Sequence, residues 1–444
     1  MGKFLIIIIM ASIIGLYPVY YVATNQKSTS VDRIAQSAKV TNMQNAASCY
    51  ANMVMYKLDK DLNNGTFNLA NFNYTESSPV FNNTNVAVVT NQIDSETFKI
   101  TISAQEGPVT ATAEVMNQQV PFSYHAMFLN TFNDNLCFGN GEGVDGPFHI
   151  NGNLGVGQVP GPEFFGNVTL TGHVNYWLGA TQANFMGFMG DTLEEGADHI
   201  TLPNHMSFVD KVGSYQLDNV FSFATDGELY VDLTTDVNGD QIVRVYGCPY
   251  DDPDLGTQTY WDSLVVDIPI ATFNAFGNVL YSANNDIYIK GTLDGAVSFC
   301  TEDDIYIAGS ILYEDDPRDD PTSDDALGLI CGNDVYIATR ELEFTPGVYY
   351  NENDVWVMAA IFTEGSLKVE DLFSWQGPRQ RGTYYTYGSR VQQSVSATWD
   401  GSANYRGYKE KIIYDTRFRR MKPPSIPLTT NRKIYNWKES ISIT

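Results

Sequence analysis

The chain has 444 residues, 43% of them hydrophobic, and a formal net charge of −26 at pH 7. Its length suffices for two or three domains with a large core. Because phosphate binding needs a basic footprint, this charge argues against nucleic acid as a partner. The five cysteines include no Cys-x-x-Cys pair, so the sequence gives little support to a zinc site.

The charge is unevenly distributed along the chain. Residues 1–375 carry 13 basic and 48 acidic side chains, whereas residues 376–444 carry 13 basic and only 4 acidic ones. The two parts therefore have net charges of −35 and +9. The sequence thus describes a cationic C-terminal segment on an acidic body.

An apolar segment opens the chain. Residues 4–22 contain no charged side chain, and nineteen residues are enough to span a bilayer as a helix. The residues that follow offer a poor cleavage site, so we expect an uncleaved anchor in the lipid bilayer rather than a signal peptide. This segment predicts a single pass through an inner membrane with an exported body, in the periplasm or at the cell surface. The anchor residues are Phe4, Ile7, Ile9, Ile13, Ile14, Tyr17 and Val22.

Local periodicity predicts a helix followed by a small sheet. Apolar residues keep a helical period over residues 31–62, including Ile34, Tyr50 and Leu58. Three stretches then alternate between polar and apolar residues as strands do, at residues 85–89, 97–102 and 109–115. A long helix followed by a small antiparallel sheet is the outline of a pilin.

Two stretches of sequence also resemble pilins. Residues 4–15 are similar to the start of type IV pilin-like proteins, and residues 45–51 resemble the alanine-rich helix of the minor pilins that assist pilus assembly. Lys3 and Ile8 depart from the major pilins, which have a Gly-Phe junction and a subunit-recruiting glutamate there. Further stretches resemble an uncharacterised family of bacterial envelope proteins with a pilin-like start, and this resemblance covers most of the chain. They are residues 146–153, 165–170, 389–391, 407–417 and 423–427. The resemblance implies a pilin-like organisation, and it brings no site residues.

A short phrase, a polar turn plus a strand, occurs four times in the second half of the chain. Its acidic residues are Asp286, Asp304, Asp334 and Asp354, at spacings of 18, 30 and 20 residues. The spacing becomes nearly constant if the acidic run 314–325 is treated as an insertion. One strand per fixed period predicts a right-handed parallel β-helix (a β-solenoid), because each coil buries its apolar side against the next.

The expected fold is therefore mainly β, with a long N-terminal α-helix, a small pilin-like α+β region and a β-solenoid with insertions. A short helix is expected at about residues 206–217 within the first insertion. The predicted regions are 1–62 (anchor and amphipathic helix), 63–130 (small antiparallel region), 131–375 (solenoid, with an insertion at 176–265 and the acidic loop 314–325) and 376–444 (basic C-terminal capping segment and tail).

The four repeated aspartates have two interpretations. Stacked on successive coils, they would form a carboxylate ladder of the kind that supplies acid and base to polysaccharide-cleaving enzymes. An Asn-Asp pair before a strand is also ordinary turn chemistry, and a catalytic pair would occur once rather than on every coil. We therefore expect turns and assign no catalytic residue. A lyase or hydrolase acting on polysaccharides is the alternative function.

Calcium is the one cofactor that the sequence suggests. The spacing Asp236-x-Asn238-x-Asp240 is that of the opening of a calcium loop, but Gly247 stands where the closing glutamate would be. The same residues fit the turn of a hairpin between strands at 229–233 and 242–246. The acidic loop is the other candidate, and a solvated loop is its alternative. Its candidate ligands are Asp315, Asp316, Asp319 and Asp320.

Two cysteines lie at similar places in successive repeats. Cys300 precedes Asp304 by four residues, and Cys331 precedes Asp334 by three. Stacked strands are about 4.8 Å apart, which is within range of a disulfide. The alternative is that both are small apolar core residues.

The basic C-terminal segment combines arginines with tyrosines. Such a surface would hold an acidic glycan, or the acidic body of another copy, through stacking and charge. Its alternative role is to cap the chain's own solenoid. The predicted function is that of a membrane-anchored, exported structural or adhesive envelope protein, a pilin-like subunit or pilus-assembly accessory that acts by surface binding. The predicted contact residues are Arg379, Arg381, Arg406, Arg417, Arg419 and Arg420.

Overall fold

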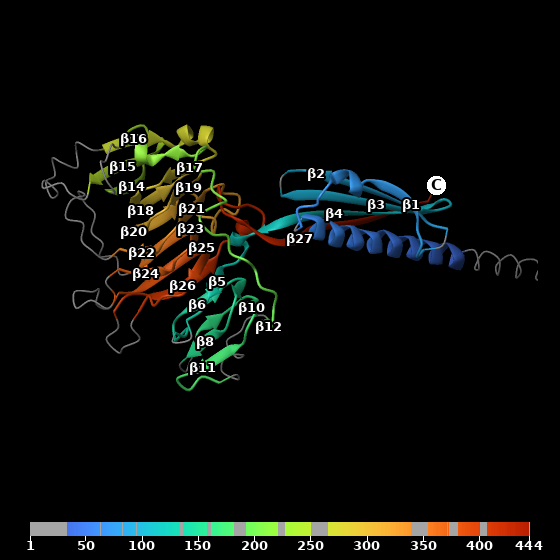
Figure 1. Cartoon of the computed structure of the whole chain (residues 1–444), viewed down its shortest axis with the longest axis horizontal. Coiled ribbons are helices and arrows are strands. Elements are labelled where there is room, and N and C mark those ends of the chain that lie inside the picture. Colours follow the sequence, from blue (N-terminus) through green and yellow to red (C-terminus); the bar gives the residue numbers. More distant parts are fainter. Residues whose placement is uncertain are drawn as a thin grey trace, which may run out of the picture. The chain divides into compact units, whose positions relative to one another are not determined.

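The fold is mainly β, as the sequence predicts, and it divides into two compact units (Figure 1). Unit 1 comprises the described residues up to Val120 and those from Thr430, and unit 2 comprises Pro121–Thr429. The chain therefore enters unit 2 once and returns to unit 1 once. The computed structural model describes residues 33–62, 64–81, 83–94, 96–133, 136–157, 161–181, 192–220, 227–249, 265–338, 354–370, 372, 381–399 and 406–443.

Unit 1 contains a helix that runs through residues 33–62. Ala46, Tyr50, Val54 and Leu58 are at most 2% exposed, because residues four apart lie on one face of a helix. Ile34, which the periodicity placed on the same face, is 69% exposed. The predicted amphipathic helix is confirmed from residue 33 onward, with an apolar face that is buried only in its second half.

An antiparallel sheet packs against this helix. Its strands are in the order β1-β2-β3-β4-β27, and the three strands predicted from alternation are confirmed as β2, β3 and β4. Phe98, Ile100 and Ile102 alternate along β3 and are at most 1% exposed, so this face of the strand belongs to the core shared with the helix. The consecutive elements are η1 (Leu69–Phe72), β1 (Tyr74–Ser77), β2 (Asn85–Gln92), β3 (Thr97–Glu106) and β4 (Val109–Pro121).

The fifth strand of this sheet comes from the other end of the chain. β27 spans Leu428–Ile443 and lies beside β4. The Arg432 side chain ties it down, because Nη2 donates hydrogen bonds to the carbonyl oxygens of Glu96 at 2.6 Å and Asn117 at 3.3 Å. The basic segment that the sequence treats as one region, residues 376–444, is therefore divided between the two units.

Unit 2 is built from strands that pair in parallel with strands one repeat away (Figure 1). Two long ladders result, and side chains at equivalent positions stack on each other. The first ladder contains β17 (Val279–Ser282), β19 (Ala296–Thr301), β21 (Ala326–Cys331), β23 (Val355–Thr363) and β25 (Thr383–Ser394). The second contains β14 (Gly227–Thr235), β18 (Asn285–Leu293), β20 (Ile305–Tyr313), β22 (Val335–Ile337) and β24 (Leu367–Val369).

The second ladder carries three of the four repeated phrases. Ile287, Ile305, Val335 and Leu367 are paired in succession, and none is more than 1% exposed. The strand after β22 is therefore β24, and Val357 of the fourth phrase pairs with Ile311 instead. The prediction that all four phrases occupy one position is wrong for the fourth, whose strand β23 pairs with Ile311 of β20 and with β21 instead.

The first strands of unit 2 stack on its last strands. β5 (Met127–Thr131) pairs with β25 through Met127 and Arg390, which are 263 residues apart. β6 (Gly143–Asp145) pairs with β26 (Lys409–Tyr414) in the same parallel sense. The first ladder then continues from β5 through β7 (Phe148–Ile150) and β10 (Val168–Leu170) to β12 (Leu193–Glu195). Beside it β6 pairs with β9 (Glu163–Phe164), and β8 (Leu154–Gly157) pairs with β11 (Val174–Trp177).

The predicted insertion 176–265 contributes to the ladders as well as interrupting them. The hairpin is confirmed, with β14 antiparallel to β15 (Gln241–Pro249), which in turn pairs with β16 (Val265–Pro269). The predicted helix at 206–217 is wrong. Turns occupy residues 205–213, followed by β13 (Tyr215–Gln216) and η3 (Leu217–Asn219). Long-range contacts replace helical ones here, since the Met206 N–H donates to Glu364 Oε1 and Lys211 pairs with Glu302.

Candidate functional site

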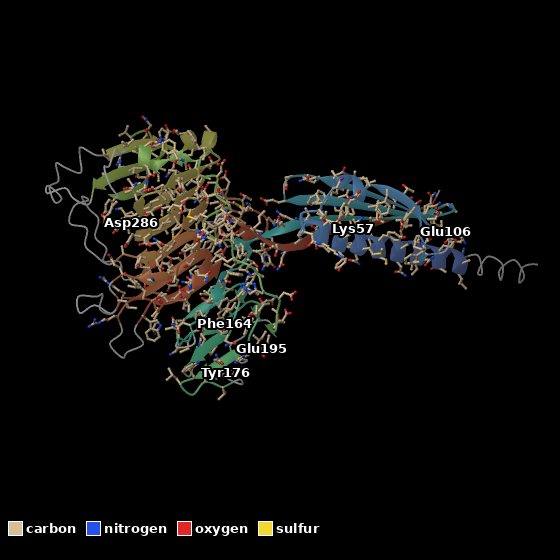
Figure 2. All side chains as sticks on the ribbon, in the orientation of Figure 1. Lys57, Glu106, Phe164, Tyr176, Glu195 and Asp286 are labelled. Atoms are coloured by element: carbon tan, nitrogen blue, oxygen red, sulfur yellow. The ribbon has the colours of Figure 1, made fainter. Side chains whose placement is uncertain are left out.

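The repeated aspartates of the second ladder bind backbone N–H groups of neighbouring repeats (Asp286 is labelled in Figure 2). The Asp304 N–H donates to Asp286 Oδ1 at 3.1 Å, and the Asp334 N–H donates to Asp304 Oδ1 at 2.8 Å. The Ser366 N–H donates in the same way to Asp334 Oδ1. Burial raises the pKa of Asp304 to about 6, and the charges of the neighbouring carboxylates act in the same direction. The three aspartates are therefore stacked on successive repeats, and their carboxylates bind backbone N–H groups 18, 30 and 32 residues along the chain.

A stack of four tyrosines lies next to the aspartates. The ring centroids of Tyr230, Tyr288, Tyr306 and Tyr336 are successively 4.6, 4.3 and 4.9 Å apart. Lys368 ends the stack, with Nζ 5.7 Å from the Tyr336 ring centroid. Each ring covers the face of the next, and such pairs contribute roughly 0.5–1.5 kcal/mol beyond their buried area. The tyrosines therefore stabilise the ladder and leave ring edges, not faces, for a ligand.

The first calcium candidate is the turn of the β14–β15 hairpin. Asp236 Oδ1 accepts hydrogen bonds from the backbone N–H of Asn238 at 2.7 Å and of Asp240 at 3.0 Å. These bonds, the one from Asp240 first, lower the pKa of Asp236. The carboxylate thus serves the turn, which is the alternative that the sequence left open.

The second calcium candidate is the acidic loop. Asp316 pairs with Arg318, and Asp320 accepts the backbone N–H of Thr322 at 2.9 Å. The side chains of Asp315 and Asp319 do not complete a cluster with them. Within the described residues, no group of three or more His, Cys, Asp or Glu side chains could hold a metal ion.

Cys300 and Cys331 are both buried and free. Cys331 is level with Thr301 in the ladder, one residue away from the position that would face Cys300. Because side chains alternate along a strand, the two sulfur atoms belong to different apolar clusters. Burial raises the pKa of both thiols. Of the two possibilities that the sequence left open, the disulfide is not formed and two core cysteines fit the structure.

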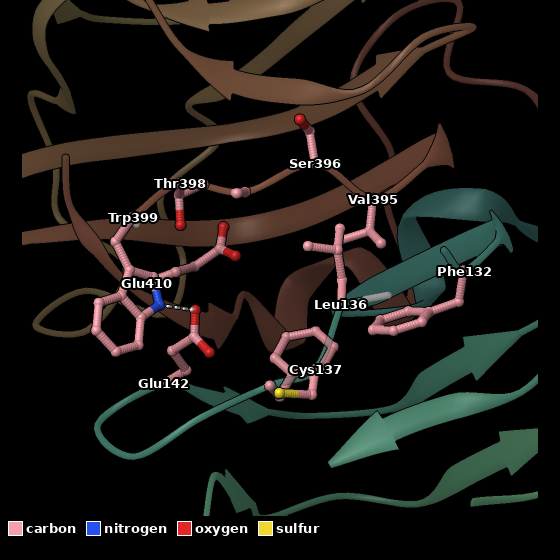
Figure 3. A pocket seen from close by; sticks show the side chains of 11 residues that line it. Phe132, Leu136, Cys137, Glu142, Val395, Ser396, Thr398, Trp399 and Glu410 are labelled. Atoms are coloured by element: carbon pink, nitrogen blue, oxygen red, sulfur yellow. Dashed lines mark hydrogen bonds between the residues drawn. The ribbon is translucent and has the colours of Figure 1, made fainter. Parts of the chain in front are cut away.

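A small pocket lies between the segment before β6 and the segment 395–399, close to β26 (Figure 3). Its volume is about 70 Å³, which holds about two water molecules. One wall is apolar and the other carries two carboxyl groups. The lining side chains include Phe132, Leu136, Cys137, Val395, Glu142, Thr398, Trp399 and Glu410.

The two carboxyl groups of this pocket have different surroundings. Glu142 accepts hydrogen bonds from the Gly139 N–H at 2.6 Å and from Trp399 Nε1 at 2.9 Å. Burial nevertheless raises the pKa of Glu142 to about 7. Glu410 is instead paired with Arg390, whose side chain is 1% exposed. The pocket can therefore hold water between a carboxyl group that titrates near pH 7 and a carboxylate paired with arginine, but it is too small for a sugar ring.

Sequence reasoning missed this buried polar group. The one local signal is a charged residue within a strand, since Arg390 lies in β25 between Ser389 and Val391 and all three are buried. Its partner Glu410 is 20 residues away, and Trp399 and Glu142 are 257 residues apart. No pattern of fixed spacing connects such residues.

Three of the six predicted contact arginines line a surface groove. The groove lies between residues 321–324 and 416–421, and its volume is about 580 Å³. Arg417, Arg419 and Arg420 contribute to its lining. Arg381 and Arg406 are half-buried elsewhere in unit 2 and do not line the groove, and Arg379 lies outside the described residues.

The membrane anchor also lies outside the described residues, so the structure gives no position for Phe4, Ile7, Ile9, Ile13, Ile14, Tyr17 or Val22. From residue 33 onward, within the described ranges, no helix is both long and apolar enough to cross a membrane.

Comparisons with known proteins give little further information. No protein-family model matches the chain, and no curated protein matches it. Among solved structures, it is similar to the competence-associated pilin ComZ from Thermus thermophilus, with 11% sequence identity and a TM-score of 0.33. The match covers 92% of this chain and 98% of that one. A likeness at this level establishes neither the fold nor the function of the chain.

Proposed function

We propose that the chain is a pilin-like structural or adhesive protein of the bacterial envelope, anchored in the inner membrane by residues 4–22 and acting by surface binding. The observation that carries this proposal is the construction of unit 1. A helix that follows the apolar segment buries Ala46, Tyr50 and Leu58 against an antiparallel sheet. Such a helix ties an apolar N-terminus to a folded body, which is the organisation that pilin-like subunits use.

Unit 2 is, in this proposal, the binding part, and its two ladders belong to a right-handed parallel β-helix. The parallel pairing of successive repeats supports this, as does the stacking of Ile287, Ile305 and Val335. A stack of coils presents long, rigid faces made of repeated turns, and repeat proteins use such faces to bind extended partners. No cofactor is needed for this role. A second copy of the chain, joined through its acidic body and basic segment in a pilin-like assembly, is a further proposed partner.

A polysaccharide-active enzyme is the second candidate function. Glu142, whose pKa is raised to about 7, and the nearby Glu410 favour it, because glycosidases use a pair of carboxyl groups with different pKa values. Two observations favour the binding role instead. The pocket has room for about two water molecules only, and Asp304 and Asp334 use carboxylate oxygens to hold backbone N–H groups.

Fractionation and protease treatment of cells that express the full chain test the proposed location. We expect the wild-type chain in the membrane fraction. External protease should cleave unit 2 in intact cells if unit 2 is displayed at the surface. If unit 2 is periplasmic, cleavage should require opening of the outer layer first. Arginine in the apolar segment costs roughly 2.5–3.5 kcal/mol per residue at the centre of a membrane helix, so the Ile9→Arg/Ile13→Arg variant should leave the membrane fraction.

Ile34→Arg is the matched control, because Ile34 is exposed on the described helix. This variant should fractionate as the wild type does. A wild-type chain that is recovered in the cytoplasmic fraction, with unit 2 protected until the cells are fully lysed, would contradict the proposed function.

A further inference from the structure

We propose that the groove between residues 321–324 and 416–421 binds the carboxylate or sulfate groups of an acidic glycan. The groove is lined by three arginines and one carboxylate, that of Asp324, on a chain whose overall charge is −26. The inference deepens the adhesive part of the proposed function and rests on it, because a glycan of the cell exterior is accessible only to an exported body.

The groove has a defined shape, because Arg417 joins its two walls through hydrogen bonds. Arg417 Nη1 donates to the carbonyl oxygen of Ser323 at 2.8 Å, and Nη2 donates to Asp415 Oδ2 at 2.6 Å. The side chains of Arg417 and Asp415 are 8% and 0% exposed. The guanidinium of Arg417 also lies over the Tyr313 ring, 5.3 Å from its centroid. This buried pair therefore holds the loop at 321–324 in place.

The other two arginines supply the binding charge. Arg419 and Arg420 are exposed, and neither forms a salt bridge with a carboxylate in the described part of the chain. Arg419 lies over the Tyr414 ring at 5.8 Å, which limits the freedom of its side chain. Guanidinium groups match the two oxygens of a carboxylate or sulfate through paired N–H donors. Adjacent arginines in a groove thus favour a ligand that carries such groups repeatedly.

The shape of the groove favours a glycan over the acidic surface of another folded protein. Its volume of about 580 Å³ lies within the roughly 300–1,000 Å³ of ordinary ligand sites. A stable contact between folded proteins needs about 800 Å² of each partner, which a groove lined by nine residues does not offer. Thr416, Pro321 and Met421 add a hydroxyl and apolar contacts suited to sugar rings. At 0.15 M salt, screening over about 8 Å limits repulsion from the acidic body.

The test measures binding of the purified full chain, in detergent, to fluorescently labelled oligogalacturonate and to a heparin-derived oligosaccharide at low and physiological salt. A neutral maltooligosaccharide and inorganic sulfate serve as comparison ligands. The Arg419→Ala/Arg420→Ala variant should bind the acidic glycans at least about tenfold more weakly, because it loses two charged hydrogen-bond donors. Lys60→Ala/Lys438→Ala is the matched control, since it removes two exposed charges from unit 1 and should bind as the wild type does.

Three results would overturn the inference. In the first, neither acidic glycan binds at low salt. In the second, the Arg419→Ala/Arg420→Ala variant binds as tightly as the wild type. In the third, sulfate alone inhibits binding and the chain does not prefer the acidic over the neutral oligosaccharide. The proposed function fails separately, because it depends on the cell fraction in which the chain is found. If the chain is found in the envelope but binds no acidic glycan, only the inference about the groove is refuted. If it binds acidic glycans but is found in the cytoplasm, only the proposed function is refuted.

Discussion

Unit 1 and unit 2 are both built from strands, but they use different kinds of pairing. In unit 1, β2, β3 and β4 are antiparallel neighbours joined by short turns, so each strand finds its partner within a few residues. In unit 2, Ile287 pairs with Ile305 and Val335 with Leu367, at separations of 18 and 32 residues. Unit 1 therefore depends mainly on local pattern, whereas unit 2 depends on repetition over long separations.

The two units also differ in the polar groups that they bury. In unit 1, the helix and sheet share an apolar core, and the buried Arg432 belongs to β27. Unit 2 instead buries Arg390, Glu410 and Glu142 near the junction of its first and last strands. Variants of these residues should destabilise one unit and leave the other unchanged. Chemical unfolding that resolves two transitions is the readout for the three predictions below.

The largest effect is expected for Arg390→Met. The variant leaves Glu410 buried without its cation, and breaking a buried ion pair in this way costs about 3–5 kcal/mol. We expect the free energy of unfolding of unit 2 to fall by this amount, and that of unit 1 to stay unchanged. The measurement is urea unfolding followed by near-UV and far-UV circular dichroism.

The double variant Arg390→Met/Glu410→Leu is the control for this prediction. It replaces the pair by apolar side chains, and such replacements are often neutral or stabilising. Most of the lost stability should return. If the double variant were as unstable as the single one, the loss would come from packing around residue 390 and not from an unpaired charge.

A pH-dependent effect is expected for Glu142→Gln. The pKa of Glu142 is about 7 in the folded protein, against 4.5 for an ordinary glutamate, so the folded state binds the proton more tightly than the unfolded state. Stability from this group is therefore fully present below about pH 4.5 and is lost as the pH rises to 7, by roughly 3 kcal/mol in all. The amide that replaces the carboxyl group cannot titrate, so the stability of the variant relative to the wild type should rise over this interval.

Unfolding free energies at pH 4, 5.5, 7 and 8 test this prediction. The difference between variant and wild type should be smallest at pH 4 and should level off above pH 7. Glu163→Gln, an exposed glutamate of the same unit, is the control and should not show this trend. A difference that is the same at all four pH values would show that Glu142 does not carry the titration.

The smallest of the three effects is expected for Arg432→Ala in unit 1. The side chain is 4% exposed, donates to two carbonyl oxygens and lies 3.6 Å from Asp59 Oδ1. Losing these charged hydrogen bonds should cost about 1.5–3 kcal/mol in unit 1 and nothing in unit 2. Amide hydrogen exchange in β27 should become faster. Lys438→Ala, on the same strand but exposed, should change neither, and equal losses in the two variants would contradict the role of Arg432.

The elements that could be predicted from the sequence are those specified by neighbouring residues. The helical period over residues 46–58, the alternation in 97–102 and the Asn238-Gly239 turn each determine a local structure, and all three are present. The polar turn before each repeated strand was predictable as well, but the partner of Asp304 was not, because its carboxylate accepts the N–H of Asp334, 30 residues along the chain.

The remainder depends on register and on residues far apart. Asp354 has the same local turn signal as Asp334, so the sequence does not reveal that its strand pairs with Ile311 of β20 and with β21. A shift of one residue separates Cys331 from Cys300, and repeat spacing is not precise enough to detect it. The sequence predicted the arginines of the groove but not its other wall, because the Ser323 carbonyl that Arg417 binds is 94 residues away in the chain.

The position of the closing strands in the sequence has a consequence for biosynthesis. β25 and β26 pair with the first strands of unit 2, and β27 completes the sheet of unit 1. Neither unit can therefore complete its sheet until residues 383–443 have been synthesised. At 5–20 residues per second, synthesis of the 263 residues from Met127 to Arg390 takes roughly 13–50 s. During this time β4 and β5 have unpaired edges that attract other strands. A chain cut short before residue 383 would keep both of these edges unpaired, and would therefore be more prone to aggregate than the full chain.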